Sequence, residues 1–126
     1  MKKVALLACL IFVFSCKKES EETFGQPNPS EVSQTPEELG KSIFEGKGNC
    51  AACHRIDEKL VGPSVKDIAK IYKEQNGDLV SFLKDEAKPI IDPSQYEVMK
   101  TNLALTKEMT DEELKGLEAY IYSSIK

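Results

Sequence analysis

One short motif constrains this chain of 126 residues more than any other feature, the pentapeptide Cys50-Ala51-Ala52-Cys53-His54. It places two thiols and an imidazole within a few residues of backbone. A structural zinc site would need four ligands, usually from a second Cys/His pair, and a thioredoxin-like redox pair would need a βαβ setting. His54 is the single histidine of the chain, and no downstream stretch has a convincing strand pattern. A local disulfide is the third simple alternative.

The pattern Cys-x-x-Cys-His is typical of the covalent attachment of a c-type haem. Two thiols add across the two vinyl groups on one edge of the porphyrin, and two intervening residues let both of them reach. The histidine that follows is then held beneath the iron as its proximal ligand. The motif therefore predicts one covalent haem c, with Cys50 and Cys53 as the attachment residues and His54 as an axial ligand of the iron.

The N-terminus has the pattern of an export signal. A short basic stretch, residues 1–3, precedes an apolar run over residues 4–14 that is too short to span a bilayer. The sequence Val13-Phe14-Ser15-Cys16 resembles the lipobox of bacterial lipoproteins. We therefore expect residues 1–15 to be a signal peptide and Cys16 to be lipidated, which would anchor the protein to a membrane. An uncleaved membrane anchor and an ordinary signal peptide are the alternatives.

The rest of the chain divides into a tether and one domain. Residues 16–35 are rich in Ser, Glu, Pro and Gln and show no apolar period, so they are expected to be flexible. Residues 36–126 are the predicted haem domain. The 17 Lys and Arg residues against 21 Asp and Glu give a net charge of −4. This balance argues against nucleic-acid binding, which needs a basic face.

The domain is predicted to be all-α, with about four helices. Thr35 and Thr110 each begin a capping box, which predicts helices directly after them. Two further helices are expected from Ser64 to Tyr72 and from Asp78 to Ala87. Residues 88–108 contain two prolines and little periodicity, so they are expected to form a loop. Short helices around a long loop leave only a thin apolar core, which suggests that something else fills the middle of the domain.

The domain resembles the class I cytochromes c, in particular the small bacterial mono-haem type. In that family the first helix carries a glycine and an aromatic residue four positions apart, which Gly40 and Phe44 match. The last helix carries a leucine and an aromatic residue three positions apart, which Leu117 and Tyr120 match. The resemblance implies a small cytochrome c fold wrapped around one covalently bound haem, and close packing of the first helix on the last.

The resemblance also assigns residues around the iron. A proline after the motif, here Pro63, would accept a hydrogen bond from the histidine ring through its carbonyl. Met99 and Met109 are the candidate sixth ligands, and the position of Met99 favours it, while Met109 fits a hydrophobic staple before the last helix. Further expected pocket residues are Ile68, Tyr96 and Asn102, together with the apolar residues Ile56, Leu60, Val61, Leu79, Phe82, Ile90, Ile91, Leu103 and Leu105.

These expectations point to an electron carrier and away from an enzyme. His/Met ligation would leave the iron no free position for a small-molecule substrate. The resemblance implies redox partners such as a quinol-oxidising complex and a terminal oxidase or reductase. The expected location is the bacterial cell envelope, lipid-anchored and facing the periplasm or the outer surface. A haem-based sensor or binding protein for small gases, with a labile sixth ligand, is the alternative function.

Overall fold

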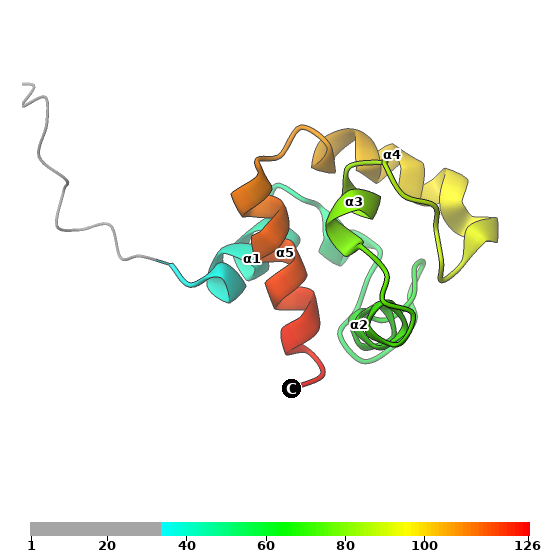
Figure 1. The fold of residues 1–126 in the computed structure, drawn as a ribbon, viewed down its shortest axis with the longest axis horizontal. Helices are drawn as coiled ribbons and strands as arrows, with labels where there is room; N and C mark the ends of the chain where they lie inside the picture. Colours follow the sequence, from blue (N-terminus) through cyan, green and yellow to red (C-terminus); the bar gives the residue numbers. More distant parts are fainter. Residues whose placement is uncertain (1–33) are drawn as a thin grey trace, which may run out of the picture. The chain divides into compact units, whose positions relative to one another are not determined.

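A computed structural model describes residues 34–126, which form a small helical domain (Figure 1). The predicted signal peptide, Cys16 and nearly all of the predicted tether lie outside these residues. The described part contains no strand, which confirms the all-α prediction. Its five α-helices and two 3-10 turns are α1 (Pro36–Glu45), η1 (Cys50–Ala52), α2 (Val65–Glu74), α3 (Leu79–Leu83), η2 (Pro93–Gln95), α4 (Tyr96–Thr106) and α5 (Asp111–Ser123).

The first and the last helix both begin at the predicted capping boxes. The Thr35 hydroxyl accepts from the backbone N–H of Glu38, and the Glu38 carboxylate accepts from the backbone N–H of Thr35. Thr110 and Glu113 repeat this exchange at the start of α5. Each box satisfies two backbone donors that the helix itself cannot pair, which explains why the two starts were readable locally.

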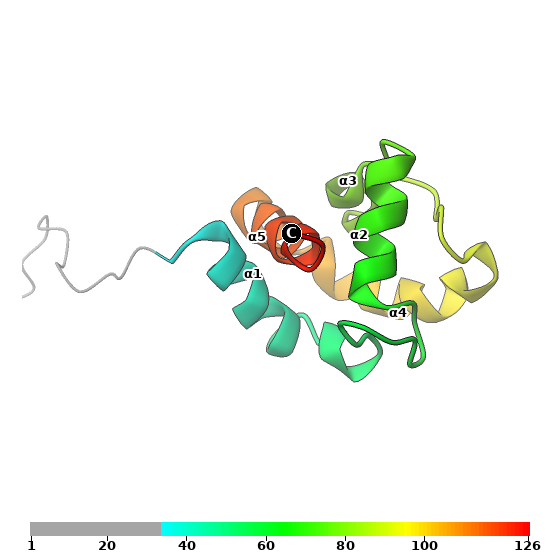
Figure 2. The same ribbon diagram turned by 90° about the horizontal axis from the view of Figure 1, so that it is seen from below.

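Helices α1 and α5 lie side by side and cross at close range (Figure 2). Gly40 and Gly116 meet at the crossing, where a Cβ on Gly40 would overlap the backbone carbonyl of Gly116. The rings of Phe44 and Tyr120 pack next to it, with centroids 5.2 Å apart. The predicted close contact through Gly40 is therefore confirmed, whereas its partner Gly116 was not foreseen.

The core lies where α1, α2, α3 and α5 meet. Val65, Ala69 and Tyr72 of α2 are buried, as are Leu79 and Leu83 of α3. These side chains pack against the buried face of α5, which consists of Leu114, Leu117 and Ile121. Helix α2 begins after the N-cap Ser64, whose hydroxyl accepts from the N–H of Asp67 at 3.0 Å.

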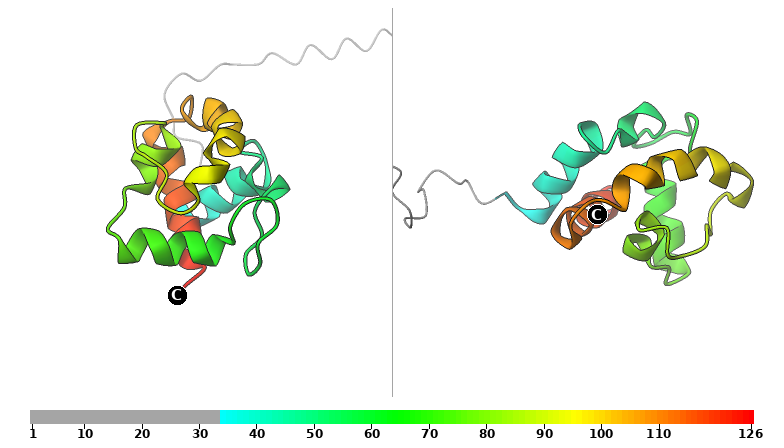
Figure 3. Two further views of the ribbon diagram at one scale, coloured as in Figure 1. Left: turned by 90° about the vertical axis from the view of Figure 1, so that its right-hand side faces the viewer. Right: turned by 90° about the horizontal axis from the view of Figure 1, so that it is seen from above.

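The segment after α3 differs from its prediction in two respects. Helix α3 ends at Leu83 and not at Ala87, because the chain turns at Asp85, whose φ of 61° lies in the left-handed region. The expectation of a loop over residues 88–108 is wrong, since this stretch contains η2 and the whole of α4. Figure 3 shows α4, in yellow and orange, at one edge of the fold.

Within residues 34–126, no helix has both the length and the apolar character that crossing a bilayer requires.

Candidate functional site

A single cavity collects most of the predicted site residues. Cys50, Cys53 and His54 line it together with Met99, although the histidine and the methionine are 45 positions apart in the sequence. The walls are mainly apolar and come from every helix of the described part. The apolar lining residues are Phe44, Val61, Pro63, Ile68, Tyr72, Leu79, Phe82, Leu83, Pro89, Ile90, Ile91, Val98, Leu117 and Ile121.

The Cys-x-x-Cys-His motif forms one tight turn directly after α1. The N–H of Cys53 and the N–H of His54 both donate to the carbonyl of Cys50, at 3.1 and 3.0 Å. Gly48 ties the start of the turn to α1, because its N–H donates to the carbonyl of Ile43 at 2.8 Å. This local folding directs both thiols and the imidazole into one cavity wall.

Cys50 and Cys53 are not joined to each other by a disulfide. Burial raises the pKa of the Cys50 thiol to about 11. The Cys50 Sγ lies 3.4 Å from the carbonyl oxygen of Gly48. Within residues 34–126, no group of three or more His, Cys, Asp or Glu side chains is arranged to hold a metal ion by itself.

The ring of His54 is held by the chain that follows it. Its Nδ1 lies 2.8 Å from the carbonyl oxygen of Pro63, which is the contact expected of that residue. Gly62 lies directly beneath the ring, and its N–H donates to the carbonyl of Cys53 at 2.9 Å. With Nδ1 engaged, Nε2 is the nitrogen left to bind a metal.

The other group of predicted residues lies on α4. Tyr96, Met99 and Asn102 are three positions apart, which puts them on one face of the helix, and all three line the cavity. The Tyr96 hydroxyl donates to Asp85, and this hydrogen bond raises the pKa of Tyr96 above its ordinary value. Met109 does not line the cavity but packs against the core before the cap of α5.

The apolar pocket was predicted in part. Ile68 lines the cavity, as do Val61, Leu79, Phe82, Ile90 and Ile91. Leu60 and Leu105 do not line it and are exposed, and Ile56 and Leu103 lie elsewhere in the fold. Sequence reasoning did not assign Phe44, Tyr72, Leu117 and Ile121 to the site. Their signal was the apolar face of each helix, which indicated burial but not the side on which a ligand would lie.

These residues fit a covalently bound haem. One turn of the chain presents the thiols of Cys50 and Cys53 and the imidazole of His54 to the cavity. The thioether of Met99 lies on another wall of the same cavity. Gly62 adds a second observation, because a Cβ there would lie 2.8 Å from His54 Nδ1 and fill the space that the ring occupies. A large apolar group with a metal at its centre matches both this donor set and the apolar lining.

The fold and the site together define a c-type haem protein. The sequence model of the cytochrome c family matches residues 37–124, and the chain belongs to this family. Members of the family carry haem c, with its iron, in covalent linkage. The match spans α1 to α5, so it covers the whole described domain except its ends.

Several bacterial cytochromes are similar to this chain over part of their length. Cytochrome c-551 of Pseudomonas denitrificans is 43% identical over 49 residues, which cover 39% of this chain and 57% of the relative. Cytochrome c-551 of Pseudomonas aeruginosa is 39% identical over 54 residues, or 40% and 51% of the two chains. Cytochrome c-552 of Nitrosomonas europaea is 43% identical over 42 residues, or 33% and 40%. The matched segments thus span about half the length of these relatives.

Proposed function

We propose that this protein is a one-electron carrier, a mono-haem cytochrome c whose iron is held between His54 and Met99. The observation that carries the proposal is that Cys50, Cys53, His54 and Met99 line one apolar cavity. The bound haem would supply reversible one-electron exchange at its iron. Membership in the cytochrome c family and the similarity to cytochromes c-551 and c-552 support the same function.

The chain's own residues would keep the site closed and rigid. The Pro63 carbonyl holds the His54 ring in one orientation and makes it a better ligand. Met99 would occupy the sixth position, so that no substrate could reach the iron. The mainly apolar walls would limit the access of water to the bound haem. Ligands that stay in place in both oxidation states keep the reorganisation that accompanies electron transfer small.

We further propose that the domain is tethered to a membrane of the bacterial cell envelope. The export signal over residues 1–15 and the lipobox-like sequence ending at Cys16 support this proposal. The polar residues 17–35 would let the domain swing between a donor and an acceptor. The expected partners are a quinol-oxidising complex and a terminal oxidase or reductase, which would make small and transient contacts.

An absorption series on the matured protein tests the electron-carrier proposal. We expect a low-spin c-type spectrum that carbon monoxide does not change in the reduced state. Met99→Ala should open the sixth position and make the spectrum sensitive to carbon monoxide. Met109→Ala is the matched control and should leave the spectrum unchanged, because Met109 does not line the cavity. Carbon monoxide binding by the unaltered protein would instead favour the gas-binding function.

A further inference from the structure

The half of α4 that carries Met99 faces the cavity. The two buried residues of the helix, Leu103 and Thr106, both lie toward its C-terminal end. Tyr96, Met99 and Asn102 line the cavity, and Met99 is partly buried against the core. Fully buried side chains thus anchor the C-terminal end of α4, whereas the turns that carry Met99 border the proposed haem site.

One side-chain hydrogen bond links these turns to another part of the described domain. The Tyr96 hydroxyl donates to Oδ1 of Asp85, eleven residues earlier in the chain. Within residues 34–126, no other side-chain hydrogen bond or ion pair links residues 96–102 to a different element. Lys100 contacts only its own helix, through Glu97 at 3.9 Å and over the Tyr96 ring at 5.7 Å.

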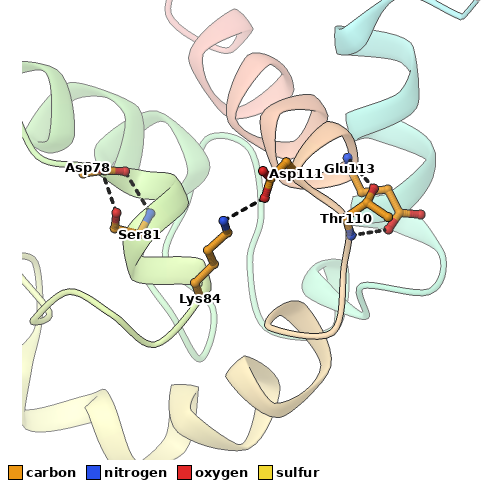
Figure 4. A network of polar contacts seen from close by, with 6 residues as sticks. All are labelled: Asp78, Ser81, Lys84, Thr110, Asp111 and Glu113. Carbon is orange, nitrogen blue, oxygen red and sulfur yellow. Dashed lines mark hydrogen bonds and ion pairs between the residues drawn. The ribbon is translucent and has the colours of Figure 1, made fainter.

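Asp85 belongs to a corner that is itself firmly placed. Lys84, the preceding residue, forms an ion pair with Asp111 at the start of α5, with Nζ 2.7 Å from Oδ1 (Figure 4). Leu83, one residue earlier, accepts a hydrogen bond of 2.6 Å through its carbonyl from the buried hydroxyl of Thr106. Residues 83–85 thus hold the C-terminal end of α4, the start of α5 and the N-terminal end of α4.

We propose that the Tyr96–Asp85 hydrogen bond positions Met99 and thereby controls how often the sixth position of the iron opens. This inference rests on the proposed role of Met99 as the axial ligand. Met99 follows Tyr96 by three residues and lies on the same face of α4. Leu103 and Thr106 anchor the last turn of α4, so an outward swing of its first turns would carry Met99 away from the iron. That movement breaks the contact with Asp85.

The test is a titration of the oxidised holoprotein with imidazole, in which binding is monitored by the visible absorption of the haem. An outside ligand binds only the open form, so its apparent affinity is proportional to the fraction of open molecules. Tyr96→Phe keeps the ring and its contact with Lys100 but removes the donor. We expect imidazole to bind this variant at least about threefold more tightly, since each opening no longer breaks the hydrogen bond. The opening rate measured at saturating imidazole should rise as well.

Two variants at Asp85 and one control define the contact. Asp85→Asn keeps an acceptor oxygen and should bind imidazole nearly as the unaltered protein does. Asp85→Gly removes the acceptor without straining the left-handed backbone, and it should behave like Tyr96→Phe. Tyr122→Phe is the matched control, because Tyr122 lies on α5 and does not line the cavity. It should leave imidazole affinity unchanged.

The outcomes separate this inference from the function on which it rests. Unchanged imidazole affinity in Tyr96→Phe and Asp85→Gly would overturn the positioning role, even if both variants unfold more easily. Met99→Ala should bind imidazole far more tightly than the unaltered protein. Equal affinity there would overturn the axial role of Met99, and with it the positioning role. A failure confined to the Tyr96 and Asp85 variants would leave the axial assignment intact.

Discussion

The backbone of Gly62 supports the imidazole ring of His54 directly. A Cβ at position 62 would lie 2.8 Å from Nδ1 and 2.9 Å from Nε2 of the ring, closer than any real Cβ contact. The carbonyl oxygen of the next residue, Pro63, lies 2.8 Å from Nδ1 of the ring. Two consecutive residues thus define both the plane and the rotation of the single histidine.

Gly62→Ala is expected to displace the His54 ring. The added methyl group meets the ring in a packed site, and overpacking of this kind costs about 1–3 kcal/mol. Denaturant unfolding of the holoprotein measures the loss. Leu60→Ala is the control in the same loop, since the Leu60 side chain is 46% exposed, and it should change stability by less than about 0.5 kcal/mol. Equal losses in the two variants would contradict the contact.

Gly40→Ala is expected to destabilise the α1–α5 crossing. The new Cβ would overlap the carbonyl of Gly116, a backbone group that cannot turn away. We expect a net loss of about 2 kcal/mol or more, even though alanine is by itself the better helix former by about 1 kcal/mol. Lys41→Ala, exposed on the same helix, should have little effect on the denaturation midpoint. A stabilised Gly40→Ala protein would show that the helices do not cross at this residue.

Thr106→Val should weaken the link between α4 and α3. The variant keeps the shape of the side chain but removes the buried hydroxyl that donates a hydrogen bond to the carbonyl of Leu83. Such a loss costs about 1–3 kcal/mol. Thr101→Val makes the same chemical change at an exposed position of α4 and serves as the control. Thermal unfolding should separate the two variants, and coinciding curves would argue against the buried hydrogen bond.

Acid should weaken the start of α5 through Glu113. Its contacts with Lys47, and then with Thr110, hold the pKa of Glu113 below its ordinary value of 4.5. The stabilisation is therefore complete above this ordinary value and is lost as the pH falls through the lower value of the folded state. Glu113→Gln cannot titrate, so its unfolding midpoint should fall less steeply between about pH 6 and about pH 3. Glu112→Gln, at the exposed neighbouring residue, is the matched control for the loss of one negative charge.

Cys16→Ser tests the proposed anchor. Without the thiol no lipid can be attached, and a tether without acyl chains does not hold a protein stably at a membrane. We expect the variant to appear in the soluble fraction of the cell envelope, while Cys9→Ser should remain with the membranes. Persistent membrane association of Cys16→Ser would exclude lipidation at this residue as the anchor.

Features whose partners lie close in the chain were predictable from the sequence. The capping boxes at Thr35 and Thr110 use residues three positions apart. The turn at Cys50–Ala52 likewise depends on neighbours. These signals indicated an all-α domain and the residues for covalent haem attachment, because the hydrogen bonds or bond-forming groups involved are within reach of one another before the chain folds.

Helix α4 was missed because its local signals are absent. Its N-cap residue, Gln95, makes no side-chain hydrogen bond to the helix, and a proline lies just before it. Its apolar residues are not gathered on one face, since Leu105 is exposed whereas Leu103 is buried. Two contacts distant in the chain link α4 to its neighbours: Thr106 bonds Leu83 at the end of α3, and Tyr96 bonds Asp85 in the turn after α3. No local pattern encodes them.

The sequence by itself determined the chemistry that this chain can offer, namely two thiols and one histidine in a fixed order and a methionine downstream. Only the tertiary structure decided that Met99 and not Met109 lies in the cavity with His54, and that Gly116 faces Gly40. The physical reason is that the chemical group that a residue carries depends on that residue alone. Distances across a fold are the joint result of all its helix packings, and no short segment contains them.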